Sequence, residues 1–185
     1  MSALPKLTPE AYLEYERQSP EKSEYINGET FAMSGASPAH NLIVLNIGAE
    51  LRNQMKRRPC RVYSSDLRVR VLDGYVYPDL TVVCRRPEFV DRDNLVNPLL
   101  IVEVLSPHTA DYDQGGKFAR YRQIASLREY LLVAQDRCAI TQYQWQDQNH
   151  WLLTEISTAE AVIHLASIEC SLALPEIYDK VFEND

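Results

Sequence analysis

The sequence predicts an α/β domain of the α+β kind, in which helices flank a mixed central β-sheet. The first observation is the order of elements, which runs helix, strand, helix, three strands, helix and then further strands. The second is the run at residues 98–105, which is apolar on both faces except for Glu103, as in a strand buried inside a sheet. The third is the length of 185 residues, which suits one domain with a substantial core. We therefore expect residues 1–185 to form a single domain.

Capping and turn signals place the elements nearest the N-terminus. Thr8 followed by Pro9 is typical of a helix start, because Thr caps the first turn and Pro suits the first helical position. Asn27-Gly28 is typical of a tight turn. The expected elements are a helix at 8–17, a strand at 29–34, a loop at 35–40 and an amphipathic helix at 39–56.

Apolar runs separated by turns predict most of the sheet. Asp73-Gly74 predicts a hairpin between the first two of these strands, and the charged segment 85–97 predicts a loop. The expected strands lie at 61–71, 76–84, 98–105, 129–135, 139–145 and 151–157. An amphipathic helix is expected at 110–124, and a short helix is expected after Pro175.

Two acidic residues lie within these strand-like runs. Asp79 belongs to the segment 75–84, and Glu103 belongs to the segment 98–105. An ionised carboxylate in a buried strand is costly unless a partner compensates it. Two such acids at neighbouring strand ends can share a divalent metal ion. A buried ion pair or a hydrogen-bonded structural acid explains the same pattern, so these two runs leave both interpretations open.

The formal net charge of −7 argues against strong attraction of the whole surface to nucleic acid. A local basic face is still compatible with this charge, although a solvated face is the commoner reason for such clusters. The candidates are the cluster Lys56, Arg57, Arg58 and Arg61, together with Arg68 and Arg70, which alternate along a predicted strand. No stretch approaches the length of a membrane span and the N-terminus has no export signal, so a cytoplasmic protein without membrane contact is expected.

The four cysteines, Cys60, Cys84, Cys138 and Cys170, do not form a metal-binding pattern. None belongs to a C-x-x-C pair and no histidine cluster lies beside them, which argues against zinc. We expect all four to be reduced, buried thiols with a structural role.

Several short motifs, in this order and spacing, resemble a known pattern. The matching segments are Glu24 with Tyr25-Ile26-Asn27-Gly28-Glu29, then Ser37-Pro38-Ala39-His40, Tyr77-Pro78-Asp79, Val102-Glu103-Val104-Leu105-Ser106-Pro107, Asp113 with Gly116-Lys117 and Tyr121, and Arg128-Glu129-Tyr130-Leu131-Leu132-Val133. Pro78-Asp79 followed by Glu103-Val104-Leu105 resembles the PD-(D/E)XK nuclease signature. Over residues 8–145 the chain resembles the Uma family within that superfamily, bacterial proteins classed as restriction endonucleases.

The resemblance implies a restriction-endonuclease-like fold with a magnesium site at Asp79 and Glu103, where manganese is an alternative ion. The backbone carbonyl of Val104 is a candidate third ligand. Phosphodiester hydrolysis needs an activated water and a stabilised oxyanion, and a divalent ion held by two carboxylates serves both needs. Magnesium keeps several waters, so two protein carboxylates are sufficient.

The chain departs from the superfamily pattern at Leu105, where the pattern has a lysine. Residues 103 and 105 share a strand face, so a lysine there would point toward the metal, and a leucine cannot replace its charge. The Uma-like pattern offers Lys117 instead, from the segment that follows. The alternative is a surface lysine that pairs with Asp113 at i, i+4 of a helix.

Two further residues are candidates for supporting roles. Glu24 could supply a third catalytic acid, or it could be a solvated glutamate in a charged stretch. His40 lies at the start of a predicted helix, where it could contact a phosphate of a nucleic acid, or it could cap the helix or pack in the core.

The function expected from these patterns is magnesium-dependent cleavage of DNA, with Asp79, Glu103, Lys117 and Glu24 as the catalytic residues and His40, Arg68 and Arg70 as nucleic-acid contacts. A domain that keeps the fold but only binds a nucleic acid or a protein is the main alternative, since fold does not determine function. A metal-dependent enzyme for a smaller phosphate substrate is a third interpretation. A homodimer would suit the cutting of two strands.

Overall fold

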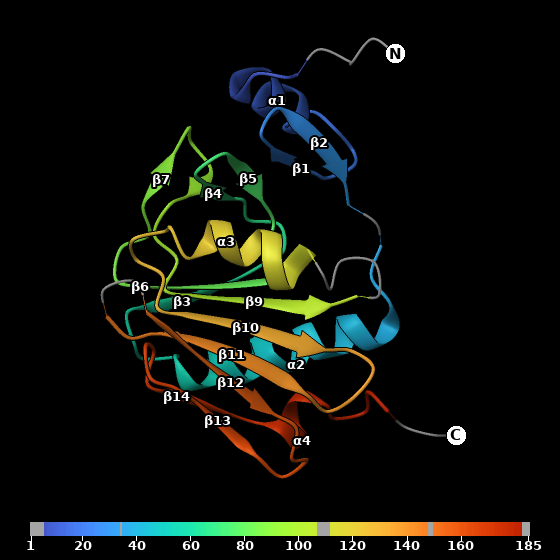
Figure 1. The fold of residues 1–185 in the computed structure, drawn as a ribbon, viewed down its shortest axis with the longest axis vertical. Helices are drawn as coiled ribbons and strands as arrows, with labels where there is room; N and C mark the ends of the chain where they lie inside the picture. The colour runs from blue at the N-terminus through green and yellow to red at the C-terminus, as the bar shows by residue number, and fades with distance from the viewer. Residues whose placement is uncertain (1–5, 34, 107–111, 148–149, 183–185) are drawn as a thin grey trace.

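The computed structural model describes residues 6–33, 35–106, 112–147 and 150–182. Its centre is a six-stranded sheet in the order β12-β11-β10-β9-β6-β3 (Figure 1). Strands β9 and β10 run parallel and the other neighbours run antiparallel, which confirms the predicted mixed sheet. The strands are β3 (Cys60–Ser64), β6 (Leu80–Cys84), β9 (Leu100–Leu105), β10 (Glu129–Ala134), β11 (Ile140–Trp145) and β12 (Trp151–Ile156).

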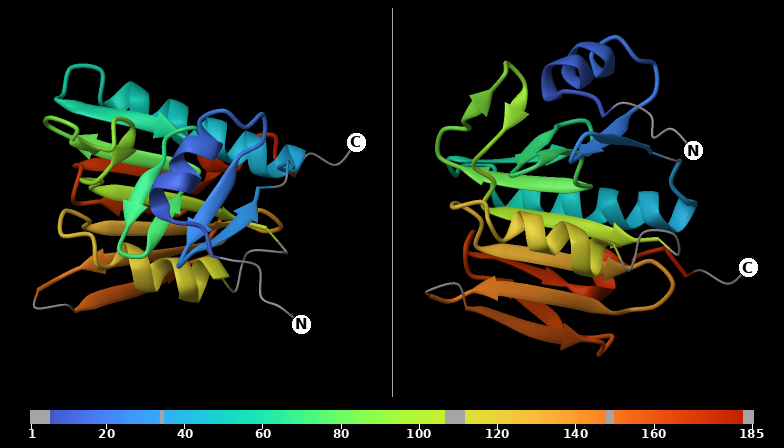
Figure 2. Two further views of the ribbon diagram at one scale, coloured as in Figure 1. Left: turned by 90° about the horizontal axis from the view of Figure 1, so that it is seen from above. Right: turned by 45° about the horizontal axis from the view of Figure 1, so that its top comes forward.

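Helices cover both faces of this sheet (Figures 1 and 2). Helix α2 (Pro38–Gln54) packs on the face that carries Val102 and Val104, together with β13 (Val162–Leu165), β14 (Cys170–Ala173) and α4 (Leu174–Ile177). Helix α3 (Phe118–Tyr121) packs on the opposite face, which carries Ile101. Because successive side chains of a strand alternate between faces, Glu103 points toward the α3 side.

A second sheet, in the order β2-β1-β5-β4-β8-β7, lies with α1 (Pro9–Glu16) at the end of the molecule away from β13, β14 and α4 (Figures 1 and 2). Its strands are β1 (Ser23–Ile26), β2 (Glu29–Ala32), β4 (Val69–Val71), β5 (Gly74–Val76), β7 (Phe89–Val90) and β8 (Asn94–Leu95). The strands predicted at 61–71 and 76–84 are therefore each divided between the two sheets, and these two predictions were wrong as continuous strands. Pro78 lies at the second break, where it cannot donate a ladder hydrogen bond.

The turn predicted at Asn27-Gly28 and the hairpin predicted at Asp73-Gly74 are both present. Asn27 and Gly28 adopt positive φ angles of 51° and 90° between β1 and β2. The turn at Asp73-Gly74 joins β4 to β5, and β5 also pairs with β1. A Cβ atom on Gly74 would lie 1.8 Å from the carbonyl oxygen of Tyr25, so this close strand approach requires glycine.

The N-terminal capping predictions are confirmed, because the Thr8 hydroxyl accepts a hydrogen bond from the Ala11 amide at the start of α1. Helix α4 contains Pro175 in its first turn, close to the predicted final helix. The short pair β13–β14 was not predicted, since strands of four residues carry little periodicity. No helix among the described residues has the length and apolar composition needed to cross a bilayer.

The helix expected at 110–124 is shorter and less regular than predicted. Within its described part, a π-helical turn, η1 (Tyr112–Lys117), leads into the single turn of α3, and residues 110 and 111 lie outside the described residues. Gly115 and Gly116 lie in η1 and weaken regular α-helix, because glycine loses more backbone entropy than other residues.

The prediction that all four cysteines are reduced was wrong for two of them. Cys60 and Cys84 form a disulfide, because the antiparallel register of β3 and β6 places them directly opposite each other. Cys138 and Cys170 are free thiols, and Cys170 is buried. The pairing depends on strand register, which residue spacing alone does not reveal.

Candidate active site

The two predicted acids lie side by side because β6 and β9 are neighbours. Asp79 immediately precedes β6, Glu103 lies in β9, and the register pairs Leu80 with Val102. The Asp79 Oδ2 atom accepts a hydrogen bond of 2.7 Å from the backbone amide of Val104. This hydrogen bond holds the Asp79 carboxylate against Val104, the residue that follows Glu103.

Glu103 is buried on the α3 side of the sheet, with 4% of its surface exposed. Its Oε1 atom accepts a 2.7 Å hydrogen bond from the Tyr121 hydroxyl. The same oxygen lies 3.2 Å from the Nζ atom of Lys117. Strand β9 therefore supplies the carboxylate of Glu103, and the segment that follows it supplies two hydrogen-bond donors, Lys117 and Tyr121.

Lys117 is a buried lysine, which excludes the alternative of a surface residue. Its Nζ atom lies 3.2 Å from Glu24 Oε1, 3.2 Å from Glu103 Oε1 and 3.3 Å from Asp113 Oδ1. The i, i+4 contact with Asp113 is thus present, but it is one of three and lies inside the protein. The π-helical turn brings Asp113 and Lys117 to the sheet face that carries Glu103.

Glu24 belongs to β1 in the second sheet and is buried rather than solvated. Its Oε1 atom accepts a 3.1 Å hydrogen bond from the Tyr77 amide and also contacts Lys117. Glu24 therefore joins the second sheet to the acids of the central sheet.

The electrostatics of this cluster follow from three carboxylates in contact with Lys117 and from Asp79, which acts on Glu103. Burial above all raises the pKa of Glu103 to about 8; Lys117 opposes this shift, and Asp79, Asp113 and Glu24 add to it. Burial disfavours the charge on Lys117, but the surrounding carboxylates outweigh burial and hold its pKa well above the usual range. The cluster thus combines a charged lysine with a carboxyl group that retains its proton near neutral pH.

His40 lies in the first turn of α2, and its Nε2 atom is 3.2 Å from Asp79 Oδ2. Both side chains are partly accessible, with exposed fractions of 16% and 14%. The helix start is held by Ser37, whose hydroxyl accepts from the His40 amide. In this structure His40 contacts an acid of the site, so it can orient Asp79.

The predicted basic face is divided by the fold. Arg68 is 6% exposed and bonds to Asp93 and Asn94, whereas Arg70 is exposed on β4. In the other basic cluster, Arg58 pairs with Glu169. Arg70 is therefore the more accessible of the two strand arginines, because the side chain of Arg68 is held in the second sheet.

Two members of the cluster had no functional role assigned from sequence. Tyr121 appears in the sequence only as part of a matching motif; in the structure it is buried in the core, and its hydroxyl donates to Glu103. Asp113 was treated as a surface partner, yet it is buried beside Lys117. The spacing 113, 117, 121 could have indicated their common face, since residues four apart are neighbours on a helix.

The donor set suits a hard divalent cation. Asp79 and Glu103 offer carboxylate oxygens from neighbouring strands, and the excess of acids over lysine favours an added positive charge. The carbonyl of Val104 faces the same side as its amide, which bonds to Asp79. Among the described residues, no group of three or more His, Cys, Asp or Glu side chains has the arrangement to hold a metal ion.

The mixed sheet and its flanking helices define a restriction-endonuclease-like nuclease fold. A crystal structure from Anabaena variabilis ATCC 29413, described as a "putative nuclease belonging to DUF820", superposes with a TM-score of 0.77. The alignment covers 95% of this chain and 99% of that chain at 17% sequence identity, so this likeness concerns the fold.

The Uma2 family model, described as "Putative restriction endonuclease", matches residues 9–175, and the chain belongs to this family. Two proteins of Synechocystis sp. (strain ATCC 27184 / PCC 6803 / Kazusa) are also similar. "Uncharacterized protein slr1290" is 35% identical over 176 residues, which cover 94% of this chain and 92% of that protein. "Uncharacterized protein sll1609" is 38% identical over 164 residues, which cover 86% and 93%. Family and fold together support a nuclease function.

Proposed function

We propose that this protein is a magnesium-dependent endonuclease that hydrolyses phosphodiester bonds in DNA. The observation that carries the proposal is the pairing of Asp79 and Glu103 on adjacent strands, with Lys117 held 3.2 Å from Glu103. The description of the matching family as a restriction endonuclease supports DNA as the substrate. In this proposal Asp79 and Glu103 hold the ion, with the Val104 carbonyl as a third ligand.

The bound ion would supply an activated water and a counter-charge for the phosphate. The protein's own contribution is to keep these groups in position before substrate arrives. Lys117 carries a positive charge into a buried site, where it stabilises the negative charge that develops on the phosphate. It provides from η1 the charge that Leu105 cannot provide from the strand.

Glu24 and His40 contact Lys117 and Asp79, the groups that act on the substrate in this proposal. Glu24 fixes the amino group of Lys117 through their 3.2 Å contact. His40 orients Asp79 through a 3.2 Å contact with Oδ2, the oxygen that also accepts from the Val104 amide. Both are therefore proposed as positioning residues, because outer partners of metal ligands and catalytic groups determine their orientation.

One observation favours the alternative of a catalytically inactive domain that binds a partner. The Oε1 atom of Glu103 already accepts from Tyr121 and Lys117, so the acid has hydrogen-bond partners without a metal ion. In that case the cluster would be a structural ion-pair network between the two sheets.

Cleavage of supercoiled plasmid DNA separates the two functions. The parent protein should nick the plasmid with magnesium or manganese and lose this activity in EDTA. Asp79→Asn should be slower by at least about a hundredfold, as expected when a group that stabilises the transition state is lost. Asp66→Asn is the matched control, because Asp66 is 84% exposed and pairs only with Lys22 among the described residues. Activity that persists in EDTA, or equally in Asp79→Asn, would contradict the proposal.

A further inference from the structure

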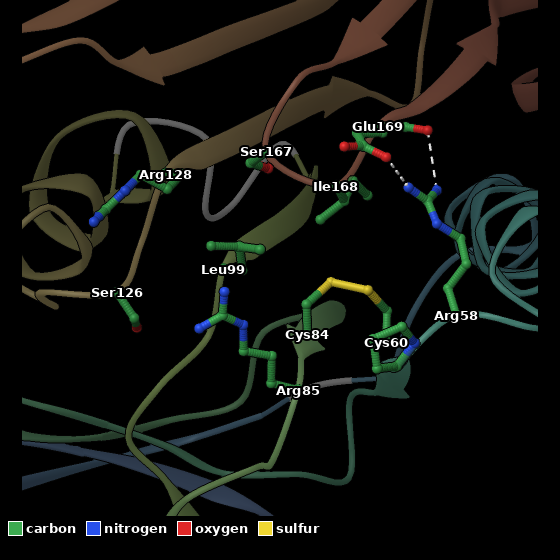
Figure 3. Close-up of a pocket in the computed structure, with 11 residues that line it drawn as sticks. Arg58, Cys60, Cys84, Arg85, Leu99, Ser126, Arg128, Ser167, Ile168 and Glu169 are labelled. Carbon is green, nitrogen blue, oxygen red and sulfur yellow. Dashed lines mark hydrogen bonds and ion pairs between the residues drawn. A yellow bond between two sulfur atoms is a disulfide. The ribbon is translucent and has the colours of Figure 1, made fainter.

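A pocket of about 660 Å³ lies at the opposite end of the central sheet from the acids. Figure 3 shows the residues that line it. Asp79 immediately precedes β6, whereas Cys84 is the last residue of that strand, so the strand separates the two sites. The Cys60–Cys84 disulfide lines this pocket, together with Leu99 and Ile168. Both cysteines are partly exposed, and both belong to the pocket lining.

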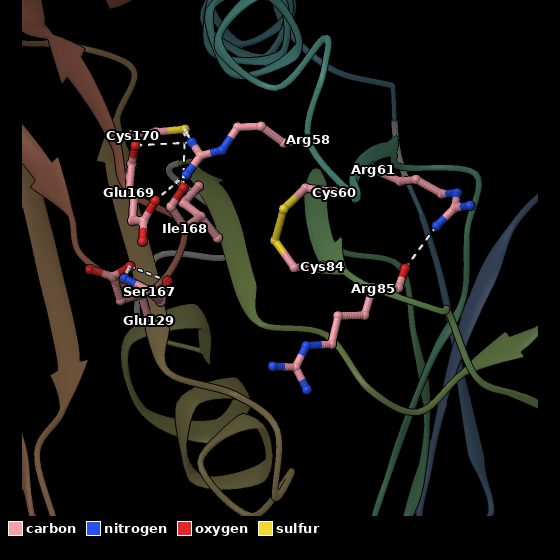
Figure 4. Close-up of a disulfide and its surroundings, with 10 residues drawn as sticks. All are labelled: Arg58, Cys60, Arg61, Cys84, Arg85, Glu129, Ser167, Ile168, Glu169 and Cys170. Carbon is pink, nitrogen blue, oxygen red and sulfur yellow. Dashed lines mark hydrogen bonds and ion pairs between the residues drawn. A yellow bond between two sulfur atoms is a disulfide. The ribbon is translucent and has the colours of Figure 1, made fainter.

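Three arginines line this pocket, and their guanidinium groups differ in the partners that they contact. The guanidinium of Arg58 bonds to Glu169 and lies 3.4 Å from the Cys170 sulfur (Figure 4). Arg128 stacks over Trp145 at 4.5 Å. Within the part of the chain that the structure describes, the Arg85 guanidinium makes no hydrogen bond or ion pair with another residue.

Arg85 is held in position through its backbone. Its amide donates to the Pro59 carbonyl, and its own carbonyl accepts from Arg61 at 2.8 Å. The side chain extends into the pocket below Leu99 and Cys84 (Figure 3). The pocket therefore contains an unengaged positive charge and a disulfide between two partly exposed cysteines.

We propose that the Cys60–Cys84 disulfide is a thiol-exchange site and that its pocket receives small anionic thiols. A thiolate is the attacking species in disulfide exchange, and a nearby cation favours both its approach and the thiolate that leaves. A ligand with a second negative group gains further from Arg85. The site is separate from the acids, so its test does not depend on nuclease activity.

The exchange takes place in two balanced steps. The thiolate sulfur of the ligand bonds to Sγ of one cysteine while the Sγ–Sγ bond breaks, and the electron pair leaves on the other cysteine as a thiolate. A second ligand thiolate attacks the mixed disulfide, which releases the small symmetric disulfide and the second protein thiolate. Two electrons thus pass from two thiols to the protein, and protons from the thiols reach the protein thiolates through water.

The experiment uses the full chain with the substitutions Cys138→Ser and Cys170→Ser, so that only Cys60 and Cys84 react. Three thiols of similar size are compared at low salt: anionic 2-mercaptoethanesulfonate, neutral 2-mercaptoethanol and cationic cysteamine. Iodoacetamide stops the reaction, and intact mass counts the alkylated cysteines. Rates are expressed per thiolate concentration, because the three thiols ionise to different extents. The anionic thiol should react about threefold to tenfold faster than the neutral one, and the cationic thiol slowest.

Arg85→Gln should remove most of this charge preference. Arg52→Gln is the matched control, because Arg52 is exposed on α2 and does not line the pocket, and it should keep the preference. Equal charge preference in Arg85→Gln and Arg52→Gln would overturn the proposal. So would alkylation of both cysteines before any thiol is added. If the double serine variant does not fold, the same counts are made on the parent, in which the buried Cys170 and the partly exposed Cys138 give the same background in every sample.

Discussion

The amino group of Lys117 lies 3.2 Å from the Oε1 atom of Glu103, although 14 residues separate them in the chain. Glu103 is in the central strand β9, and Lys117 ends the π-helical turn that follows. The segment that follows strand β9 therefore brings the amino group of Lys117 back to the buried carboxylate of Glu103. This contact connects the stability of the fold with the proposed chemistry.

Replacing Lys117 with methionine should destabilise the protein strongly. Methionine keeps the length of the side chain but leaves Glu24, Glu103 and Asp113 without their shared cation. Breaking a buried ion pair costs about 3–5 kcal/mol, and protonation of the acids offsets part of this. Urea denaturation of Lys117→Met measures the loss, and Lys22→Met, at a pair exposed to solvent, is the control with a loss below about 1 kcal/mol. A Lys117→Met protein as stable as the parent would show that the cluster does not need its cation.

Stability without metal should decrease as the pH rises through the range in which Glu103 titrates. Its pKa is about 8 in the folded protein and 4.5 ordinarily, so between these values the folded state holds a proton that the unfolded state has lost. The free energy of unfolding should therefore fall by up to about 1.4 kcal/mol per pH unit in that window, relative to Glu103→Gln. Urea denaturation of both proteins in EDTA, at several pH values across the window, measures this difference. Parallel pH profiles would contradict a proton on Glu103.

Metal binding should release a proton from the same group. A ligand carboxyl must ionise, so below a pKa of about 8 the affinity for magnesium or manganese should rise with pH by up to about tenfold per unit. Calorimetric titration in two buffers of different ionisation enthalpy gives the number of protons released, expected to approach one near pH 6.5, which is about 1.5 units below the pKa. Asp66→Asn should behave as the parent. Binding that is independent of pH would separate Glu103 from the metal site.

Removing the imidazole of His40 should weaken metal binding without unfolding the protein. His40 contacts Asp79 at the accessible edge of the site, and outer partners of this kind contribute about tenfold to a hundredfold in metal affinity. His40→Ala should show this loss by calorimetry, and His40→Gln, which can still donate to the carboxylate, should recover part of it. Equal affinities in the parent and His40→Ala would assign His40 a different role, such as the phosphate contact expected from sequence.

The sequence by itself determined the local elements and the candidate acids. Thr8 and Pro9 start a helix, Asn27-Gly28 makes a turn, and the apolar run around Glu103 forms a buried strand, because these signals act over a few neighbouring residues. The ordered motifs also sufficed to identify the family and the nuclease-like fold.

Only the tertiary structure decided which distant residues meet. The division of the predicted strands between two sheets, the Cys60–Cys84 disulfide and the burial of Arg68 all depend on strand register and packing. The same holds for Lys117, whose contacts come from β1, β9 and its own turn. Such contacts join segments far apart in the chain, and their free energy is gained only when the whole sheet assembles. For that reason residue spacing could propose Lys117 as a partner of the acids, but it could not distinguish a buried cation from one on the surface.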